Sequence, residues 1–211
     1  MPEKAHGKIQ NLLTRAARQN NPATQKDSSV ASTTRVLPTI TEAEKLFSIL
    51  HRKLFQIEHW NACSNISTFE LFDETGKAQP KKTAALGDFV KITLPGSGKD
   101  DWVKIISIDE AQDETILTLQ PSPNPVDEEN EQNTSHFFTS DSTNNFCLQR
   151  ESAKINFYII GLDETPNTEE TGGVLETARN YATAKLGCLL GIQKTQWEIF
   201  CSNFLEIEKS N

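Results

Sequence analysis

Two helix-capping motifs, one before and one after the middle of the chain, constrain its fold more than any other feature. Residues 39–42 and 195–198 both have the pattern Thr-x-x-Glu. In this motif the hydroxyl and the carboxylate pair with backbone amides that the first turn of a helix leaves unpaired. We therefore predict helices that begin at Thr39 and at Thr195, on either side of a middle region rich in strand-like sequence.

The residues after Thr39 form a broad apolar stripe. Positions three or four apart carry the following side chains: Ile40, Ala43, Phe47, Leu50, Leu54 and Ile57. Such a stripe is typical of a helix that lies on a sheet, or of one shared between a core and a partner. We expect the helix to run to about His59, with Phe47, Leu50 and Leu54 as candidates for a face that meets a partner.

The middle of the chain alternates between apolar and polar residues in short segments separated by turn-type residues. The expected strands are 67–72, 87–94, 102–108, 115–119, 136–139, 145–149 and 155–160. Consecutive strands with short turns favour antiparallel pairing. Residues 174–190 have a helical pattern, Gly191 marks a break, and the helix from Thr195 follows.

Helices at the two ends of a run of strands predict an α+β fold. We expect an antiparallel curled sheet or small barrel of six or seven strands, flanked by an N-terminal helix and a long broken C-terminal helix. The order of the strands stays open.

Charge is distributed unevenly along the chain. Residues 1–38 hold six basic and two acidic residues, although the whole chain has a net charge of -8. Their content of Asn, Gln, Ser and Thr is typical of a disordered segment. We predict a flexible basic leader over 1–38, and a single α+β domain over 39–211 with an exposed acidic loop at 121–135.

The composition also argues against several classes of protein. An acidic chain lacks the basic surface that binds nucleic acid through its phosphates. No stretch approaches the ~20 apolar residues needed to span a bilayer, and the N-terminus lacks the apolar core of a secretory signal. We therefore expect a cytoplasmic protein. The four cysteines have no spacing typical of a zinc site or a disulfide framework (Cys63, Cys147, Cys188 and Cys201).

Two segments look like parts of the nucleotide site of a superfamily 1 helicase. Residues 94–100 resemble its phosphate loop, and residues 105–113 resemble its magnesium-binding strand end. The required first glycine is replaced by Thr93, and the hydroxyl after Lys99 is replaced by Asp100. We interpret both segments as turns between antiparallel strands.

Other catalytic patterns are incomplete. His59 and Cys63 could form the pair of a cysteine hydrolase, but no oxyanion donors can be assigned to them. The four histidines are scattered, and the pairs Asp73–Glu74 and Asp163–Glu164 are explained by turn chemistry. We assign no catalytic residue, no metal and no cofactor.

Aromatic and polar residues offer a different hypothesis. Six of them could line a cavity between the sheet and the C-terminal helix, although packing of an ordinary core explains the same residues: Trp60, Trp102, His136, Phe138, Tyr158 and Trp197. The sequence favours a non-enzymatic interaction or structural module, a subunit of a larger assembly with a protein partner or a second copy. The alternative is a cyclase-like helix-grip domain that binds a small apolar ligand in such a cavity.

Overall fold

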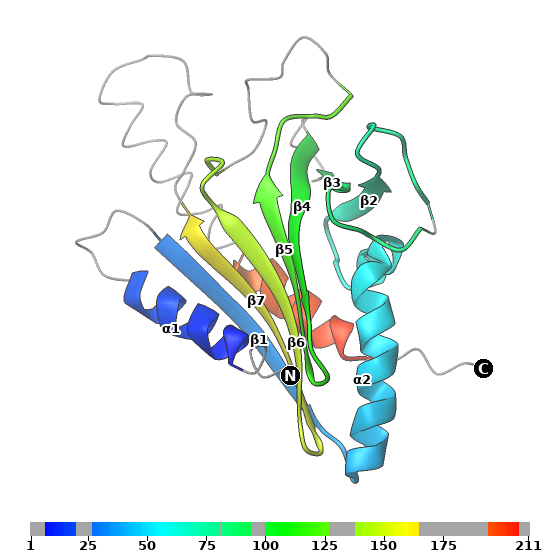
Figure 1. The fold of residues 1–211 in the computed structure, drawn as a ribbon, viewed down its shortest axis with the longest axis vertical. Coiled ribbons are helices and arrows are strands. Elements are labelled where there is room, and N and C mark those ends of the chain that lie inside the picture. Colours follow the sequence, from blue (N-terminus) through cyan, green and yellow to red (C-terminus); the bar gives the residue numbers. More distant parts are fainter. Residues whose placement is uncertain are drawn as a thin grey trace.

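The computed structural model describes residues 7–19, 27–80, 82–93, 100–126, 138–164 and 194–206. Seven antiparallel strands form one sheet in the order β1-β7-β6-β5-β4-β3-β2 (Figure 1). The strands are β1 (Asp27–Val36), β2 (Thr68–Phe72), β3 (Phe89–Thr93), β4 (Asp100–Glu110), β5 (Glu114–Pro121), β6 (Thr143–Glu151) and β7 (Lys154–Glu164). The edge strands β1 and β2 do not pair with each other, so the sheet is open. The predicted α+β fold is confirmed, in its sheet form rather than its barrel form.

One strand was missed from sequence. β1 has the polar sequence DSSVASTTRV, and it pairs along its length with β7, from Ser29–Gly161 to Val36–Lys154. Its backbone bonds to the neighbouring strand hold it in place, and its side chains contribute few apolar contacts. The strand predicted over 136–139 is not among the strands of the sheet. Residues 138–139 lie outside the named strands, and residues 136–137 lie outside the described residues.

Helix α1 (Lys8–Gln19) covers one face of the sheet, which we call the outer face (Figure 1). Its buried side chains Ile9 and Ala16 pack against strand residues Ile116, Cys147 and Ile160. Together, α1 and β1 correct the prediction of a flexible leader, because residues 8–19 and 27–36 are regular structure. The division of the chain into domains remains a prediction.

The opposite, inner face carries helix α2 (Ile40–Phe55), the 3-10 helix η1 (Ile57–Ala62) and a C-terminal helix over residues 194–204. The amide of Glu42 donates to the Thr39 hydroxyl at 3.2 Å, which confirms the first predicted cap. α2 ends at Phe55, before the expected His59, because the chain tightens into η1 there. The second cap is not observed, because Lys194 is already helical and Thr195 therefore lies inside the helix.

Aromatic rings fill the centre of the inner face. Trp60 stacks on Phe146 at 4.5 Å between centroids, and Phe157 stacks on Phe204 of the C-terminal helix at 4.0 Å. Phe200 contacts several of the same rings. The helix predicted over 174–190 lies outside the described residues. Among the described segments, no helix is long and apolar enough to cross a membrane.

Candidate functional site

The six residues expected to line a cavity do not gather in one place. Trp60 and Trp197 lie on the inner face, where both contact Phe146 and Phe200. Tyr158 packs with the apolar cluster under α1, on the outer face. Residues on opposite faces of a sheet cannot line one cavity, so this set divides at least into two.

The other three candidates add no common cavity. Trp102 makes an edge contact with Phe72 at 4.8 Å and belongs to neither apolar cluster. Phe138 is buried, and His136 lies outside the described residues.

The candidates for a partner face are part of the protein's own core. Leu50 and Leu54 are fully buried, and Phe47 is only 8% exposed. All three belong to the inner cluster that joins α2 to the sheet. The broad apolar stripe of α2 is therefore used mainly to cover strands.

The incomplete catalytic patterns have structural explanations. The Cys63 thiol is buried and donates to the backbone carbonyl of His59 at 3.6 Å. Burial raises the pKa of this thiol, although nearby Lys53 lowers it, and a raised pKa opposes formation of the nucleophilic thiolate. Within the described part of the chain, no three His, Cys, Asp or Glu side chains are grouped as metal ligands.

The helicase-like segments also fall at hairpins. Thr93 and Asp100 pair across β3 and β4, and residues 94–99 between them lie outside the described residues. Residues 105–113 run from β4 into its turn with β5. This placement supports the interpretation of both segments as connections between antiparallel strands.

A β-bulge interrupts the regular pairing at the end of β7. Asp163 has a φ of +53°, in the left-handed region, and the pairing with β1 shifts between Asp27 and Ser29. Bulges re-aim side chains and are frequent beside functional sites. Here the extra residue shifts the alternation of side chains, so that Asp163 points to the outer face, as Leu162 does, and Glu164 points to the inner face.

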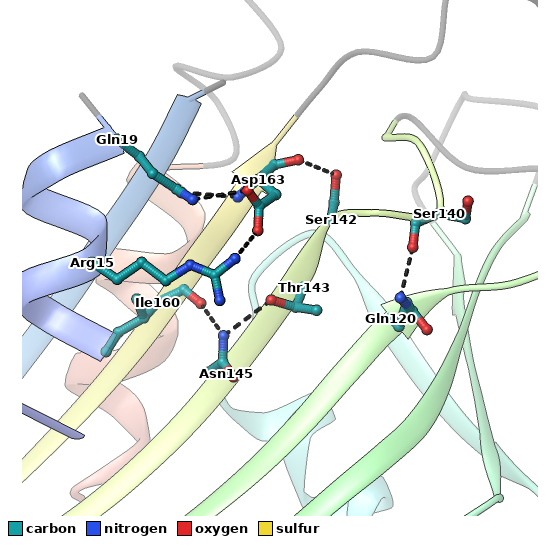
Figure 2. Close-up of polar contacts among 9 residues, drawn as sticks. All are labelled: Arg15, Gln19, Gln120, Ser140, Ser142, Thr143, Asn145, Ile160 and Asp163. Carbon is teal, nitrogen blue, oxygen red and sulfur yellow. Dashed lines mark hydrogen bonds and ion pairs between the residues drawn. The ribbon is translucent and has the colours of Figure 1, made fainter. Parts of the chain in front are cut away.

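Asp163 faces α1 on the outer side (Figure 2). Its carboxylate pairs with Arg15 and accepts from the Gln19 amide at 2.8 Å. The Gln19 side-chain oxygen in turn accepts from the Asp163 backbone amide at 3.0 Å. The Ser142 hydroxyl donates to the Asp163 carbonyl at 2.9 Å. These bonds hold both the bulge and α1 in place.

Glu164 lies on the inner side. The register of the strands places four residues in one row across β1, β7, β6 and β5, namely Ser29, Gly161, Asn144 and Leu119. The next row on this face is Ala31, Ile159, Phe146 and Leu117, all of which belong to the inner core. The Glu164 carboxyl occupies the space where a side chain at 161 would begin, and the Ser29 hydroxyl donates to it at 2.9 Å. Only glycine at 161 permits this arrangement.

The Glu164 carboxyl is in an unfavourable place for a charge. The residue is 3% exposed, and burial raises its pKa from 4.5 to about 7. The bond from Ser29 lowers this pKa and the neighbouring Asp27 carboxylate raises it. Among the described residues, no cationic side chain forms an ion pair with Glu164.

Two further polar atoms on this face have no hydrogen-bond partner. One is Oδ1 of Asn144, a residue that is 6% exposed. The other is Nε1 of Trp197, whose ring centroid lies 5.6 Å from that of Phe146. We call Ser29, Asn144, Glu164 and Trp197 the bulge site. It combines a protonatable carboxyl, a free acceptor and a free donor beside an aromatic core.

Sequence reasoning found only Trp197 of these four residues. The useful signal was the segment from Gly161 to Glu164, in which a glycine and two acids interrupt an apolar strand. The strand expected from sequence ends at residue 160, and the two acids are explained there by turn chemistry. A glycine inside a strand can instead mark a bulge or a close approach.

No known protein family matches this sequence, and no curated protein matches it. Among solved structures, the chain is similar to hypothetical protein jhp0584 from Helicobacter pylori, with a TM-score of 0.49 and 7% identity over 89% of this chain and 91% of that one. It is also similar to Ara h 8.0201, with a TM-score of 0.36 and 13% identity over 84% and 98% of the two chains. A third similar structure is the di-domain ARO/CYC protein BexL from the BE-7585A biosynthetic pathway. Its TM-score is 0.39 and its sequence identity is 10%, over 83% of this chain and 45% of that one. These likenesses are too distant to carry an argument about function.

Proposed function

We propose that this protein is a non-enzymatic binding domain whose small-molecule ligand contacts the bulge site. The observation that carries the proposal is that two buried polar atoms of the inner face, Asn144 Oδ1 and Trp197 Nε1, have no hydrogen-bond partner. Asn144 also lies directly opposite Gly161, whose side-chain space the buried Glu164 carboxyl occupies. Each unpaired buried polar atom costs about 1–3 kcal/mol. Such atoms are rare in folded proteins, and a ligand that pairs with them recovers this cost.

The proposal places the ligand at one end of the inner face. The middle of that face is occupied by stacked rings, including Trp60, Phe146 and Phe204. Trp60 donates its indole hydrogen to the Leu54 carbonyl at 3.2 Å and has no bond left to offer. Four buried side-chain atoms in the described part of the chain have no hydrogen-bond partner. Glu114 Oε2 and Thr115 Oγ1 lie at the start of β5, whereas Asn144 Oδ1 lies at the opposite end of the inner face, where the Glu164 carboxyl is also buried.

The indoles of Trp60 and Trp197 make a direct test possible. A library of small fragments would be screened by two-dimensional NMR, following the indole resonances and the side-chain amide of Asn144. We expect hits to shift the Trp197 indole and the Asn144 amide together, while the Trp60 indole stays in place. Asn144→Leu should abolish the shift of the Trp197 indole. The proposal is wrong if bound fragments move only resonances remote from both residues, or if no fragment binds.

A second candidate function is association with a protein partner. The supporting observation is a groove of about 790 Å³ between α2, η1 and residues 203–206, lined by side chains that include Ile49, Arg52, Glu58 and His59. Ile49 is 39% exposed, and charges of both signs surround it. Sedimentation and light scattering should then detect an assembly that Ile49→Glu weakens. A monomer at every concentration, with no partner recovered in pull-downs, would contradict this candidate.

A further inference from the structure

We propose that the ligand of the bulge site carries an amine, whose ammonium group pairs with the Glu164 carboxylate and donates to Asn144 Oδ1. This inference rests on the proposed function and specifies its chemical class. It follows from what surrounds the carboxyl on each side.

The first argument is the missing counter-charge. A buried carboxylate is strongly disfavoured unless a cation pairs with it. Among the described residues, the hydrogen bond to the Glu164 carboxyl comes from the neutral Ser29 hydroxyl. The nearby guanidinium of Arg15 is already paired with Asp163 on the outer face. Asp27, at the start of β1, adds negative charge. A ligand cation would supply what the described residues of the chain do not.

The second argument is the position of the free acceptor. Asn144 and Gly161 are directly opposite each other on β6 and β7. Side chains at opposite positions start about 4.5–5.5 Å apart. Because the Glu164 carboxyl occupies the side-chain space of Gly161, it lies on the same face as Asn144 and close to it. An ammonium group has three donors and no acceptor, so it can bond to both residues at once.

The third argument excludes the opposite class of ligand. A carboxylate or phosphate group would meet the buried Glu164 carboxyl with a like charge, and the exposed Asp27 carboxylate would add to the repulsion. The chain as a whole also has a net charge of -8, which repels anions at longer range. The free donor of Trp197 Nε1 therefore calls for a neutral acceptor on the ligand, such as an ether, hydroxyl or carbonyl oxygen.

Protonation provides a readout that is independent of any variant. Burial raises the pKa of Glu164 to about 7, so the carboxyl is largely neutral in mildly acidic solution. An alkyl ammonium group keeps its proton well above this pH, as a lysine side chain does. Binding of the amine should therefore strengthen as the pH rises through 7, and it should release a proton from Glu164. The groups facing Glu164 are Asp27 and Ser29 from β1 and Asn144 from β6, and none of them reverses this direction.

The experiment uses three probes of similar size with different head groups. They are 2-phenylethylamine, 2-phenylethanol and 3-phenylpropionate, titrated into the full chain while the Trp197 indole resonance is followed. Above pH 7 we expect the amine to bind about tenfold more tightly than the alcohol, as a net gain of ~1.4 kcal/mol implies. The anion should bind most weakly. Below pH 7 the advantage of the amine should shrink.

A matched pair of variants tests the assignment to Glu164. Glu164→Gln should remove the preference for the amine over the alcohol. Glu58→Gln makes the same change of charge on the exposed surface of η1 and should keep the preference.

The two proposals fail in different ways. If the alcohol binds as tightly as the amine above pH 7, the inference about the amine is overturned and the binding site remains. If none of the three probes moves the Trp197 or Asn144 resonances, both proposals are overturned. Because the pH profile is measured on the unaltered protein, the outcome does not depend on whether Glu164→Gln folds.

Discussion

Trp60 and Trp197 have nearly the same aromatic neighbours but very different polar surroundings. Both rings contact Phe146 and Phe200 on the inner face. The indole hydrogen of Trp60 is donated to the Leu54 carbonyl, whereas that of Trp197 is buried without a partner. The comparison teaches that apolar packing alone does not separate a structural aromatic residue from a functional one. The polar atom at its edge makes the distinction.

The same contrast extends to the two regions around these residues. Near Trp60 the rings of α2, η1, the sheet and the C-terminal helix form a dense cluster. Near the end of β7 the same face carries a bulge, a buried acid and an unpaired amide oxygen. Strain and unsatisfied groups reduce stability and are concentrated where proteins function. We therefore expect substitutions in the first region to cost stability and those in the second to alter binding.

The largest effect should come from the ring that the two tryptophans share. Phe200 is 1% exposed and contacts Trp60, Phe146 and Trp197. Phe200→Ala should lower the free energy of unfolding by about 3–5 kcal/mol, because it leaves a cavity in a packed core. Denaturant unfolding measures this loss. As a control, Ile106→Ala at a 39% exposed position should change stability little. A small loss at Phe200 would show that the inner face is loosely packed.

The next effect is a dependence of stability on pH that arises from Glu164. Its pKa is raised from 4.5 to about 7 in the folded protein. The folded state therefore holds the proton more tightly, and the stability contributed by Glu164 is complete below pH 4.5. This contribution should be lost as the pH rises to about 7, by on the order of 3 kcal/mol.

Glu164→Gln provides the control for this profile, because its side chain stays neutral. The variant should have a flatter pH profile over the same range and should be more stable than the unaltered chain in mildly alkaline solution. Thermal unfolding of both proteins at a series of pH values measures the two stability profiles. Identical profiles for the two proteins would mean that Glu164 is solvated in the folded state.

The fold was more predictable from sequence than the site. The stripe after Ile40 and the Thr39 cap encode α2 locally, because helical spacing and capping depend on neighbouring residues. β1 could not be found in this way, since its polar side chains give no periodic signal and its pairing partner β7 lies more than 100 residues away. Long-range pairing, rather than local preference, determines that strand.

The bulge site was hidden for the same reason. Ser29, Asn144 and Glu164 are far apart in the chain, and only the register of β1, β7 and β6 brings them together. Glu164 also reaches the inner face only because Asp163 adopts a positive φ. Trp197 was recognised as a candidate from its residue type, but its unpaired Nε1 depends on three-dimensional surroundings that a sequence pattern does not contain.

A smaller effect is expected when the satisfied indole is removed. Trp60→Phe keeps an aromatic ring in the core but leaves the Leu54 carbonyl without the donor it now has. We expect a loss of about 1–3 kcal/mol, in the range for an unpaired buried polar group, in addition to some loss of packing. Denaturant unfolding measures it, and ligand binding by the folded fraction should be unaffected. An unchanged stability would indicate that water or another donor replaces the indole.

The smallest change in stability should come from the same substitution at the other tryptophan. Trp197→Phe removes a buried donor that has no partner, so the lost ring contacts are offset by relief of an unsatisfied group. We expect the free energy of unfolding to change by less than about 1 kcal/mol, and fragment binding at the bulge site to weaken markedly. The pair of Trp→Phe variants thus separates stability from binding with one chemical change. If Trp197→Phe destabilises the protein as much as Trp60→Phe does, the indole of Trp197 already has a hydrogen-bond partner in solution. Trp197 would then be wrongly assigned to the bulge site.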